Sequence, residues 1–187
     1  MHGFPSSSHM FRNLIPRLNG DFHVVAADLP GDFLRGRRRG SGGARGVAAD
    51  PRLRPPVALR LHHSNPTRVA AFVVQNANAY KAGLTPAFQP IIDYGNDQSD
   101  VNERSVLNFE TAKFQFLHGM PDVTLVSPDA IISCQYTLDT PGNDTIQLSY
   151  FADYNSSIAL YDTWHADIRR NQPAVLVLFR KNDPFFF

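Results

Sequence analysis

Asp183 is a side chain near the end of the chain that could do acid chemistry. It lies in the polar turn Lys181–Phe185, which follows the apolar run Pro173–Phe179. A carboxylate held in such a turn can orient a histidine that acts as general base. An aspartate in front of a proline is also an ordinary turn former. The residues alone leave both roles open.

The histidines do not follow the spacing of a metal site. His62 and His63 are neighbours, and consecutive residues of a helix point in different directions, so they do not readily chelate one ion. We expect them at the end of a helix, where cations interact favourably with the helix dipole. Other histidines are scattered along the chain, at His9, His23, His118 and His165. No spacing of His, Asp and Glu argues for a metal ion, so no metal site is predicted.

Apolar runs and amphipathic stretches alternate along most of the chain. Residues 10–18 and 57–61 repeat their apolar side chains at helical spacing, and Ser6–Ser8 offer capping oxygens for the first helix. Short apolar runs predict buried strands at Phe22–Ala27, Arg68–Val74 and Pro173–Phe179. Apolar strands flanked by helices predict an α/β fold, with a mostly parallel sheet and helices on both of its faces.

Residues 80–165 differ in character from the segments on either side. Prolines separate amphipathic stretches near 101–118, 128–138, 143–152 and 156–170, which predicts a helical insertion. We therefore divide the chain into a partial core at 1–77, a helical cap at 78–165 and a return to the core at 166–187.

The segment 32–56 is rich in arginine, glycine and proline and has no apolar periodicity. Seven arginines fall within twenty positions, at Arg35, Arg37, Arg38, Arg39, Arg45, Arg52 and Arg54. Such a segment cannot bury enough surface to order itself, so we expect a loop or disordered stretch without a strand. Arginines can bind phosphates, but no aromatic residue from position 34 to 71 offers a stacking platform. No nucleic-acid partner is therefore expected.

The composition of the whole chain predicts a globular protein. Its 187 residues are 43% hydrophobic and 19% charged, with a net charge of +1. The single cysteine, Cys134, excludes an intrachain disulfide and fits a reducing compartment. No apolar run is long enough to span a bilayer, and the N-terminus lacks the pattern of a signal peptide. We expect a cytoplasmic protein without a membrane partner, and nothing in the sequence specifies an oligomeric state.

Four segments, taken in order, resemble one known family. They are the opening turn His2-Gly3-Phe4-Pro5, the run Phe22–Ala27 leading to Asp28-Leu29-Pro30-Gly31, the join Asn65–Val69, and the loop Lys181–Phe185. Together they resemble α/β-hydrolases of the epoxide hydrolase and haloalkane dehalogenase branch. The resemblance leaves out only 32–56 and implies a partial α/β-hydrolase fold with an inserted helical cap.

The resemblance also implies a reaction and residues for it. In the family, a nucleophile on a strand-to-helix turn attacks the substrate, backbone N–H groups stabilise the oxyanion, and an acid orients the histidine base. Gly3 and Phe4 match the oxyanion loop, with the Phe4 amide facing the oxyanion, and Asp183 matches the acid. The reaction uses only water, so no cofactor is implied. The implied substrate is a small organic molecule in a pocket between core and cap.

Cap tyrosines of epoxide hydrolases donate hydrogen bonds to the epoxide oxygen. Tyr150 and Tyr154 are the candidates by position, although most such aromatic side chains serve packing. Asn76, just after the second predicted strand, is a candidate polar contact in the pocket, and it is equally suited to a turn.

The nucleophile and the histidine are the parts of the family pattern that this sequence does not match. No Gly-x-Ser-x-Gly or Gly-x-Asp-x-Gly occurs between Gly31 and Val57, and Asp50 precedes Pro51 without flanking glycines or a preceding strand. The histidine is expected after a further strand and helix, and the chain ends first. We therefore expect an inactive or impaired hydrolase. The alternative is non-catalytic: a degenerate fragment, or a remnant that binds small molecules.

A shifted reading frame would explain the missing nucleophile turn. Arg52-Leu53-Arg54 can be encoded by CGA CTA CGG, which reads Asp-Tyr-Gly one nucleotide later. We hypothesise that 32–56 is frameshifted or mis-spliced. The nucleotide sequence tests this, because a shifted frame without a hydrolase-like segment excludes it.

Overall fold

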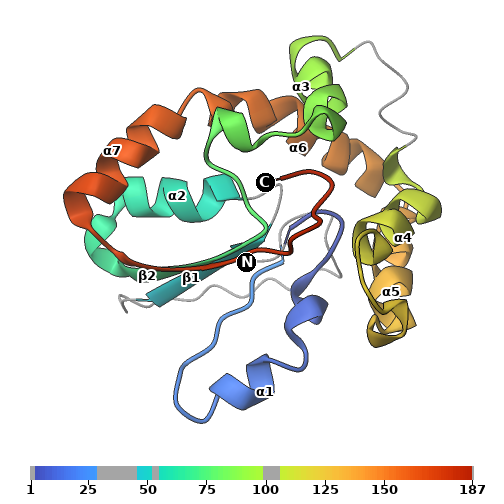
Figure 1. Ribbon diagram of the computed structural model, residues 1–187, viewed down its shortest axis with the longest axis horizontal. Helices are drawn as coiled ribbons and strands as arrows, with labels where there is room; N and C mark the ends of the chain where they lie inside the picture. Colours follow the sequence, from blue (N-terminus) through green and yellow to red (C-terminus); the bar gives the residue numbers. More distant parts are fainter. Residues whose placement is uncertain (1–2, 29–45, 52–54, 99–105, 187) are drawn as a thin grey trace.

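A three-stranded parallel sheet runs through the part of the chain that the structure describes. This computed structural model describes residues 3–28, 46–51, 55–98 and 106–186 (Figure 1). The strands lie in the order β1-β2-β3, with bounds Gly46–Pro51, Val69–Gln75 and Ala174–Leu178. Pro51 lies opposite Gln75, and Gln75 opposite Leu178, so the carboxyl ends of the three strands are level.

Helices make up most of the remaining ordered chain. They are α1 (Ile15–Leu18), α2 (Pro55–Ser64), α3 (Gln89–Asn96), α4 (Phe109–Leu117), α5 (Pro128–Leu138), α6 (Asn143–Ile158) and α7 (Tyr161–Asn171). Short 3-10 turns lie at Ser8–Phe11, Pro66–Arg68, Lys81–Gly83, Pro86–Phe88 and Val123–Leu125. Within the described ranges, no helix has the length and apolar character that crossing a membrane requires.

The helices form two groups around the sheet. Helix α2 packs against both α7 and β1, and in Figure 1 α2 and α7 lie above the sheet. Helix α3 packs on α6, and α4 packs on α5, at the right of the view. The helical spacing in the sequence correctly predicted α2, α5, α6 and α7, because each has an apolar face that packs on a neighbour.

Buried apolar side chains gather in two clusters. The larger one, here called the loop-and-cap cluster, consists of Phe4, Phe88, Ile91, Leu138, Leu148, Phe151, Tyr154 and Phe186. The smaller one, here called the sheet cluster, consists of Ala58, Val69 and Phe72. The larger cluster thus joins the first residues described to the last ones through helices of the predicted cap.

Strand β1 corrects the prediction that 32–56 contains no strand. Gly46–Pro51 pairs in parallel with Val69–Gln75 along its whole length. Its small apolar residues, Val47 to Ala49, stand next to the arginine-rich stretch and carry too little periodicity to be recognised alone. The strand depends on a partner that lies more than twenty positions further along, which a local pattern does not reveal.

The segment Phe22–Ala27 was predicted to be a buried strand, and this prediction is wrong. It forms no strand, and Phe22 and Val25 are 62% and 77% exposed. A strand needs a neighbour for its backbone groups, and none of the described strands pairs with this segment. Asp28 instead ties its end to Ser8, whose backbone N–H and hydroxyl donate to the carboxylate at 2.6 and 2.7 Å.

Strand β3 exists as predicted but is not buried. All five of its residues are exposed, and Val177 is 59% exposed. The strand has β2 on one side and no described strand on the other, so its apolar sequence is covered only by part of the sheet.

The helix predicted for 10–18 is divided into two short pieces. A 3-10 turn at Ser8–Phe11 is capped by Ser7, whose hydroxyl accepts from the N–H of His9 at 3.3 Å. Helix α1 starts only at Ile15, with Pro16 in its first turn, where a missing N–H does no harm. The capping prediction for Ser6–Ser8 is confirmed, and the continuous helix is wrong.

Candidate active site at the carboxyl edge of the sheet

The level ends of the strands bring distant segments of the chain to one edge. Asn76–Asn78 follows β2 directly, and Phe179–Asp183 follows β3. Ligands of open parallel sheets bind outside the carboxyl ends of the strands. This edge is therefore the place where the sequence-predicted residues can act together.

Asp183 is held by donors on two sides. One carboxylate oxygen, Oδ1, accepts from the backbone N–H groups of Phe185 at 2.8 Å and Phe186 at 3.1 Å. The other, Oδ2, accepts from Nδ2 of Asn76 at 2.8 Å. Asp183 therefore closes its own turn and is also bound by the side chain of Asn76, which follows β2. Its role as the acid stays a prediction. Three donors to one carboxylate favour a fixed orientation.

Asn76 connects the end of β2 to the loop after β3. Its side chain donates to Asp183, and its Oδ1 accepts from the N–H of Arg180 at 3.1 Å. Its backbone N–H donates to the carbonyl of Leu178 at 3.2 Å. Asn76 adopts a left-handed backbone with φ of 45°, which asparagine tolerates better than most residues. It therefore serves as a turn residue and as the tie that orients the acid.

Gly3 and Phe4 form a buried turn close to that edge. The carbonyl of Gly3 accepts from the N–H of Ser6 at 2.8 Å and from its hydroxyl at 2.7 Å. The Phe4 ring meets Phe151 edge to face, with centroids 5.0 Å apart. The segment Phe179–Phe186 is here called the acid loop. Phe4 and Phe186 belong to the same cluster, so the opening turn and the acid loop share one core. The oxyanion role of the Phe4 amide stays a prediction, and His2 lies outside the described residues.

Tyr154 is packed inside the loop-and-cap cluster. It is 3% exposed, and its hydroxyl lies 3.1 Å from the hydroxyl of Tyr161. Burial raises the pKa of Tyr161, while the hydrogen bond with Tyr154 acts against that rise. Tyr150, one turn earlier in α6, is partly buried and is not a member of the cluster. The structure thus brings Tyr154, Phe4 and Phe186 together and leaves Tyr150 at their margin.

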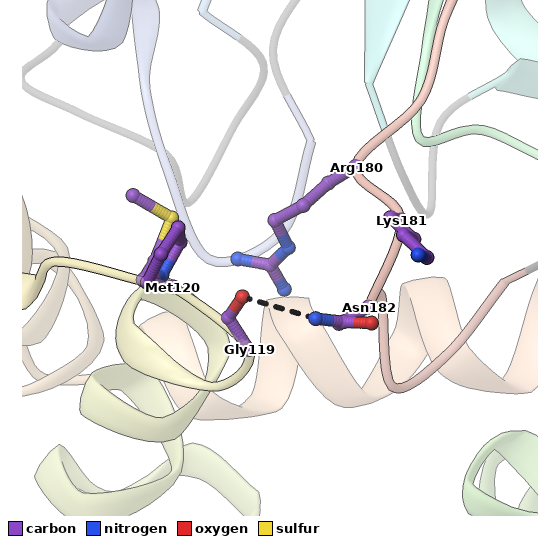
Figure 2. A pocket seen from close by; sticks show the side chains of 6 residues that line it. Gly119, Met120, Arg180, Lys181 and Asn182 are labelled. Atoms are coloured by element: carbon purple, nitrogen blue, oxygen red, sulfur yellow. Dashed lines mark hydrogen bonds between the residues drawn. The ribbon is translucent and has the colours of Figure 1, made fainter.

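Sequence reasoning missed Arg180, which was treated only as part of a polar turn. The loop after β3 borders a cavity of about 490 Å³, lined by Gly119, Met120, Pro121, Arg180, Lys181 and Asn182 (Figure 2). Two guanidinium nitrogens of Arg180, Nε and Nη2, are buried and have no hydrogen-bond partner among the described residues. The signal in the sequence was a basic pair placed directly after an apolar strand.

The two histidines of α2 lie in its last turn, as predicted, but in different surroundings. His62 is buried against Phe72, with ring centroids 5.3 Å apart, and burial lowers its pKa. His63 forms an ion pair with Asp167 of α7. These contacts lie with β2 and α7, and neither involves a residue of the acid loop.

Solved structures of hydrolases share this fold. Cfl2 of Burkholderia cenocepacia superposes with a TM-score of 0.69 and 15% identity, covering 96% of this chain and 78% of that protein. A candidate epoxide hydrolase of Pseudomonas aeruginosa gives 0.68 and 20%, covering 97% and 71%. The proposed ancestral haloalkane dehalogenase AncHLD2 gives 0.67 and 17%, covering 95% and 71%.

A curated relative is similar in sequence along the whole chain. The uncharacterized hydrolase YNR064C of Saccharomyces cerevisiae is 34% identical over 216 residues, which cover 100% of this chain and 73% of the yeast protein. The chain belongs to the α/β-hydrolases. No protein-family profile matches it. This α/β-hydrolase has a short parallel sheet, which fits the partial form of the fold expected from its sequence.

In this α/β-hydrolase, the position expected for the nucleophile falls between β1 and α2. The strand ends at Pro51 and the helix begins at Pro55, so the connecting residues are Arg52, Leu53 and Arg54. None of the three carries a hydroxyl, thiol or carboxylate, and their structure lies outside the described residues. Asp50 is in β1, opposite Val74, so the strand that the sequence did not predict is present in front of this join.

Proposed function

We propose that this chain is an epoxide hydrolase-type protein for small organic substrates. We also propose that it is catalytically inactive or impaired. Hydrolase membership and fold follow from the comparisons above, and the substrate type and the impairment are our inference. The proposal needs no cofactor, because water completes the reaction. We also propose a cytoplasmic location, because the single cysteine fits a reducing compartment.

The hydrogen bond between Asn76 and Asp183 is the main support for assigning Asp183 as the acid of the family's reaction. These side chains stand 107 positions apart in the sequence, and their 2.8 Å bond orients a carboxylate at the edge where parallel sheets bind ligands. An acid in such a position can orient a histidine base. The bond therefore supports a hydrolase ancestry in which Asp183 was the acid.

The composition of the join between β1 and α2 supports impairment. In the Asp-nucleophile reaction, a carboxylate oxygen attacks the epoxide carbon, the carbon–oxygen bond breaks, and the resulting ester is hydrolysed by water. Arg52, Leu53 and Arg54 offer no such oxygen. The ester cannot form from these residues, so the oxyanion contribution of Phe4 would have nothing to stabilise.

The second candidate function is non-catalytic binding of a small molecule. The cavity of about 490 Å³ beside the acid loop favours it, because its volume is that of an ordinary small-molecule pocket. Binding needs no nucleophile, so this function is compatible with the same residues.

Hydrolysis of an aryl epoxide and of a p-nitrophenyl ester tests the proposal. We expect the chain to turn over neither substrate above the uncatalysed rate, and Asp183→Ala to change nothing. The matched control is Asp139→Ala, which removes an exposed carboxylate at the end of α5 that accepts a hydrogen bond from the side chain of Gln135.

The same assay has an outcome that would contradict the proposed impairment. Turnover that falls by about 10⁴-fold in Asp183→Ala, the order of loss seen when a triad acid is replaced, would overturn the impairment. Unchanged turnover in Asp139→Ala would then attribute that loss to the acid position.

A further inference from the structure

The cavity beside the acid loop is lined by two segments that are distant in the sequence. Gly119, Met120 and Pro121 follow α4, and Arg180, Lys181 and Asn182 follow β3. Gly119 has a φ of 72°, and a Cβ added to it would lie 2.6 Å from the Cβ and carbonyl oxygen of Asn182. Glycine is thus required for this close approach, which holds the two walls together.

Arg180, which is partly buried, brings a positive charge to the walls of this cavity. Figure 2 shows its guanidinium directed toward the segment of Gly119 and Met120, while the side chain of Lys181 points away from it. Nε and Nη2 of Arg180 are buried without a hydrogen-bond partner among the described residues. A buried charged donor without a partner is costly, so an acceptor that reaches these nitrogens would be favoured.

Asp183, in the same loop, is not an acceptor for Nε and Nη2 of Arg180. The carboxylate of Asp183 accepts from Phe185, Phe186 and Asn76, and the Arg180 nitrogens Nε and Nη2 are not among its donors. The backbone N–H of Arg180 is itself tied to Asn76 at 3.1 Å. The loop therefore fixes the main chain of Arg180, whose side chain lines the cavity and keeps two buried donors without a partner among the described residues.

The chemistry of the walls selects the ligand. A guanidinium presents paired N–H groups whose geometry matches a carboxylate. Met120 and Pro121 supply apolar surface on the opposite wall. We propose that this cavity is a binding subsite for a small organic carboxylate, with its charged end at Arg180 and its apolar part against Met120 and Pro121. The assignment of this ligand as a substrate rests on the proposed function, whereas its binding does not.

Calorimetric titration with hexanoate, hexanamide and inorganic phosphate tests the subsite on the intact chain. The amide has the shape of the acid without its charge, and phosphate has charge without an apolar part. We expect saturable binding of hexanoate at least about 10-fold tighter than that of either other probe, which follows from the charge-assisted pair and the apolar wall.

Three variants identify the wall that binds. Arg180→Gln should reduce hexanoate affinity about 10-fold or more and remove the preference over the amide. Arg170→Gln makes the same substitution on an exposed side chain of α7, outside the cavity lining, and should change affinity less than about 3-fold. Met120→Trp should weaken hexanoate by filling the cavity from the other wall while keeping the charge.

Several outcomes would overturn the subsite. Equal binding of hexanoate and hexanamide to the unchanged chain would exclude charge recognition, and tighter binding of phosphate would make it an inorganic-anion site. Full preference retained in Arg180→Gln would place the recognition elsewhere. If Arg180→Gln fails to fold by circular dichroism, the comparison of ligands on the unchanged chain and Met120→Trp still decide. Because no turnover is measured, an inactive chain that binds hexanoate separates this inference from the proposed function.

Discussion

The two buried clusters of this α/β-hydrolase differ in what they hold together. The loop-and-cap cluster takes side chains from the opening turn, three helices and the acid loop, and Phe88 and Phe151 are each 1% exposed. The sheet cluster takes only Ala58, Val69 and Phe72 from α2 and β2. Strand β3, at the edge of the same sheet, remains exposed throughout.

This difference separates the site from the strands that support it. The acid loop packs against residues of α3, α5 and α6 through Phe185 and Phe186, and Asp183 is bound by Asn76. The sheet contributes the alignment of its carboxyl ends and little burial. Changes in the loop-and-cap cluster should therefore affect the candidate site more than changes in the sheet.

Phe151→Ala and Phe72→Ala test this comparison with the largest expected effect. Phe151 packs on Phe4 in the large cluster, and its loss should lower the free energy of unfolding by about 3–5 kcal/mol. Phe72 lies in the small cluster, where neighbours can relax more easily, so we expect about 3 kcal/mol at most. Urea denaturation measures both, and a larger loss for Phe72→Ala would contradict the ranking.

Replacement of Asn76 tests the tie between β2 and the acid loop. Asn76→Gly keeps the left-handed backbone but loses the side-chain hydrogen bonds to Asp183 and Arg180, which should cost about 1–2 kcal/mol. Asn76→Ala loses the same bonds and adds strain of about 1 kcal/mol. Urea midpoints of the two variants separate these effects. Equal stability of Asn76→Gly and the unchanged chain would show that the tie does not stabilise the fold.

We expect the free energy of unfolding to depend on pH through His62, which lies next to the sheet cluster. Burial lowers its pKa below the ordinary value of 6.5, the nearby Asp167 acts to raise it, and His63 acts to lower it. The unfolded chain therefore binds the proton first, so stability is complete above pH 6.5 and falls as the pH drops toward the lowered pKa.

Urea unfolding at several pH values checks this expectation. His62→Phe removes the titrating ring and should flatten the fall in stability below pH 6.5, whereas His63→Gln should retain most of it. A fall of the same size in His62→Phe would assign the pH dependence to other groups.

Val177→Thr on β3 has the smallest expected effect. The residue is 59% exposed, so the loss of apolar character should change the free energy of unfolding by no more than about 0.5 kcal/mol. A buried strand, as the apolar sequence suggested, would lose clearly more. A loss above about 1 kcal/mol in urea denaturation would therefore indicate that β3 is covered in solution.

Most local elements and the family were predictable from the residues alone. Helical spacing specified α2, α5, α6 and α7, and apolar runs specified β2 and β3, because each pattern repeats within one element. The turn at Asp183 was recognisable from its residues, and so was the missing nucleophile between Gly31 and Val57. These features depend on residue types that stand next to each other in the chain.

Features that depend on distant partners were not predictable from local residue patterns. Strand β1 exists because Val69–Gln75 pairs with it, and Phe22–Ala27 fails as a strand because no described segment does. The bond from Asn76 to Asp183 joins residues 107 positions apart. Two guanidinium nitrogens of Arg180 are buried, and the segment after α4 lines the same cavity as Arg180. Pairing and burial are properties of the folded neighbourhood, and a local pattern does not contain them.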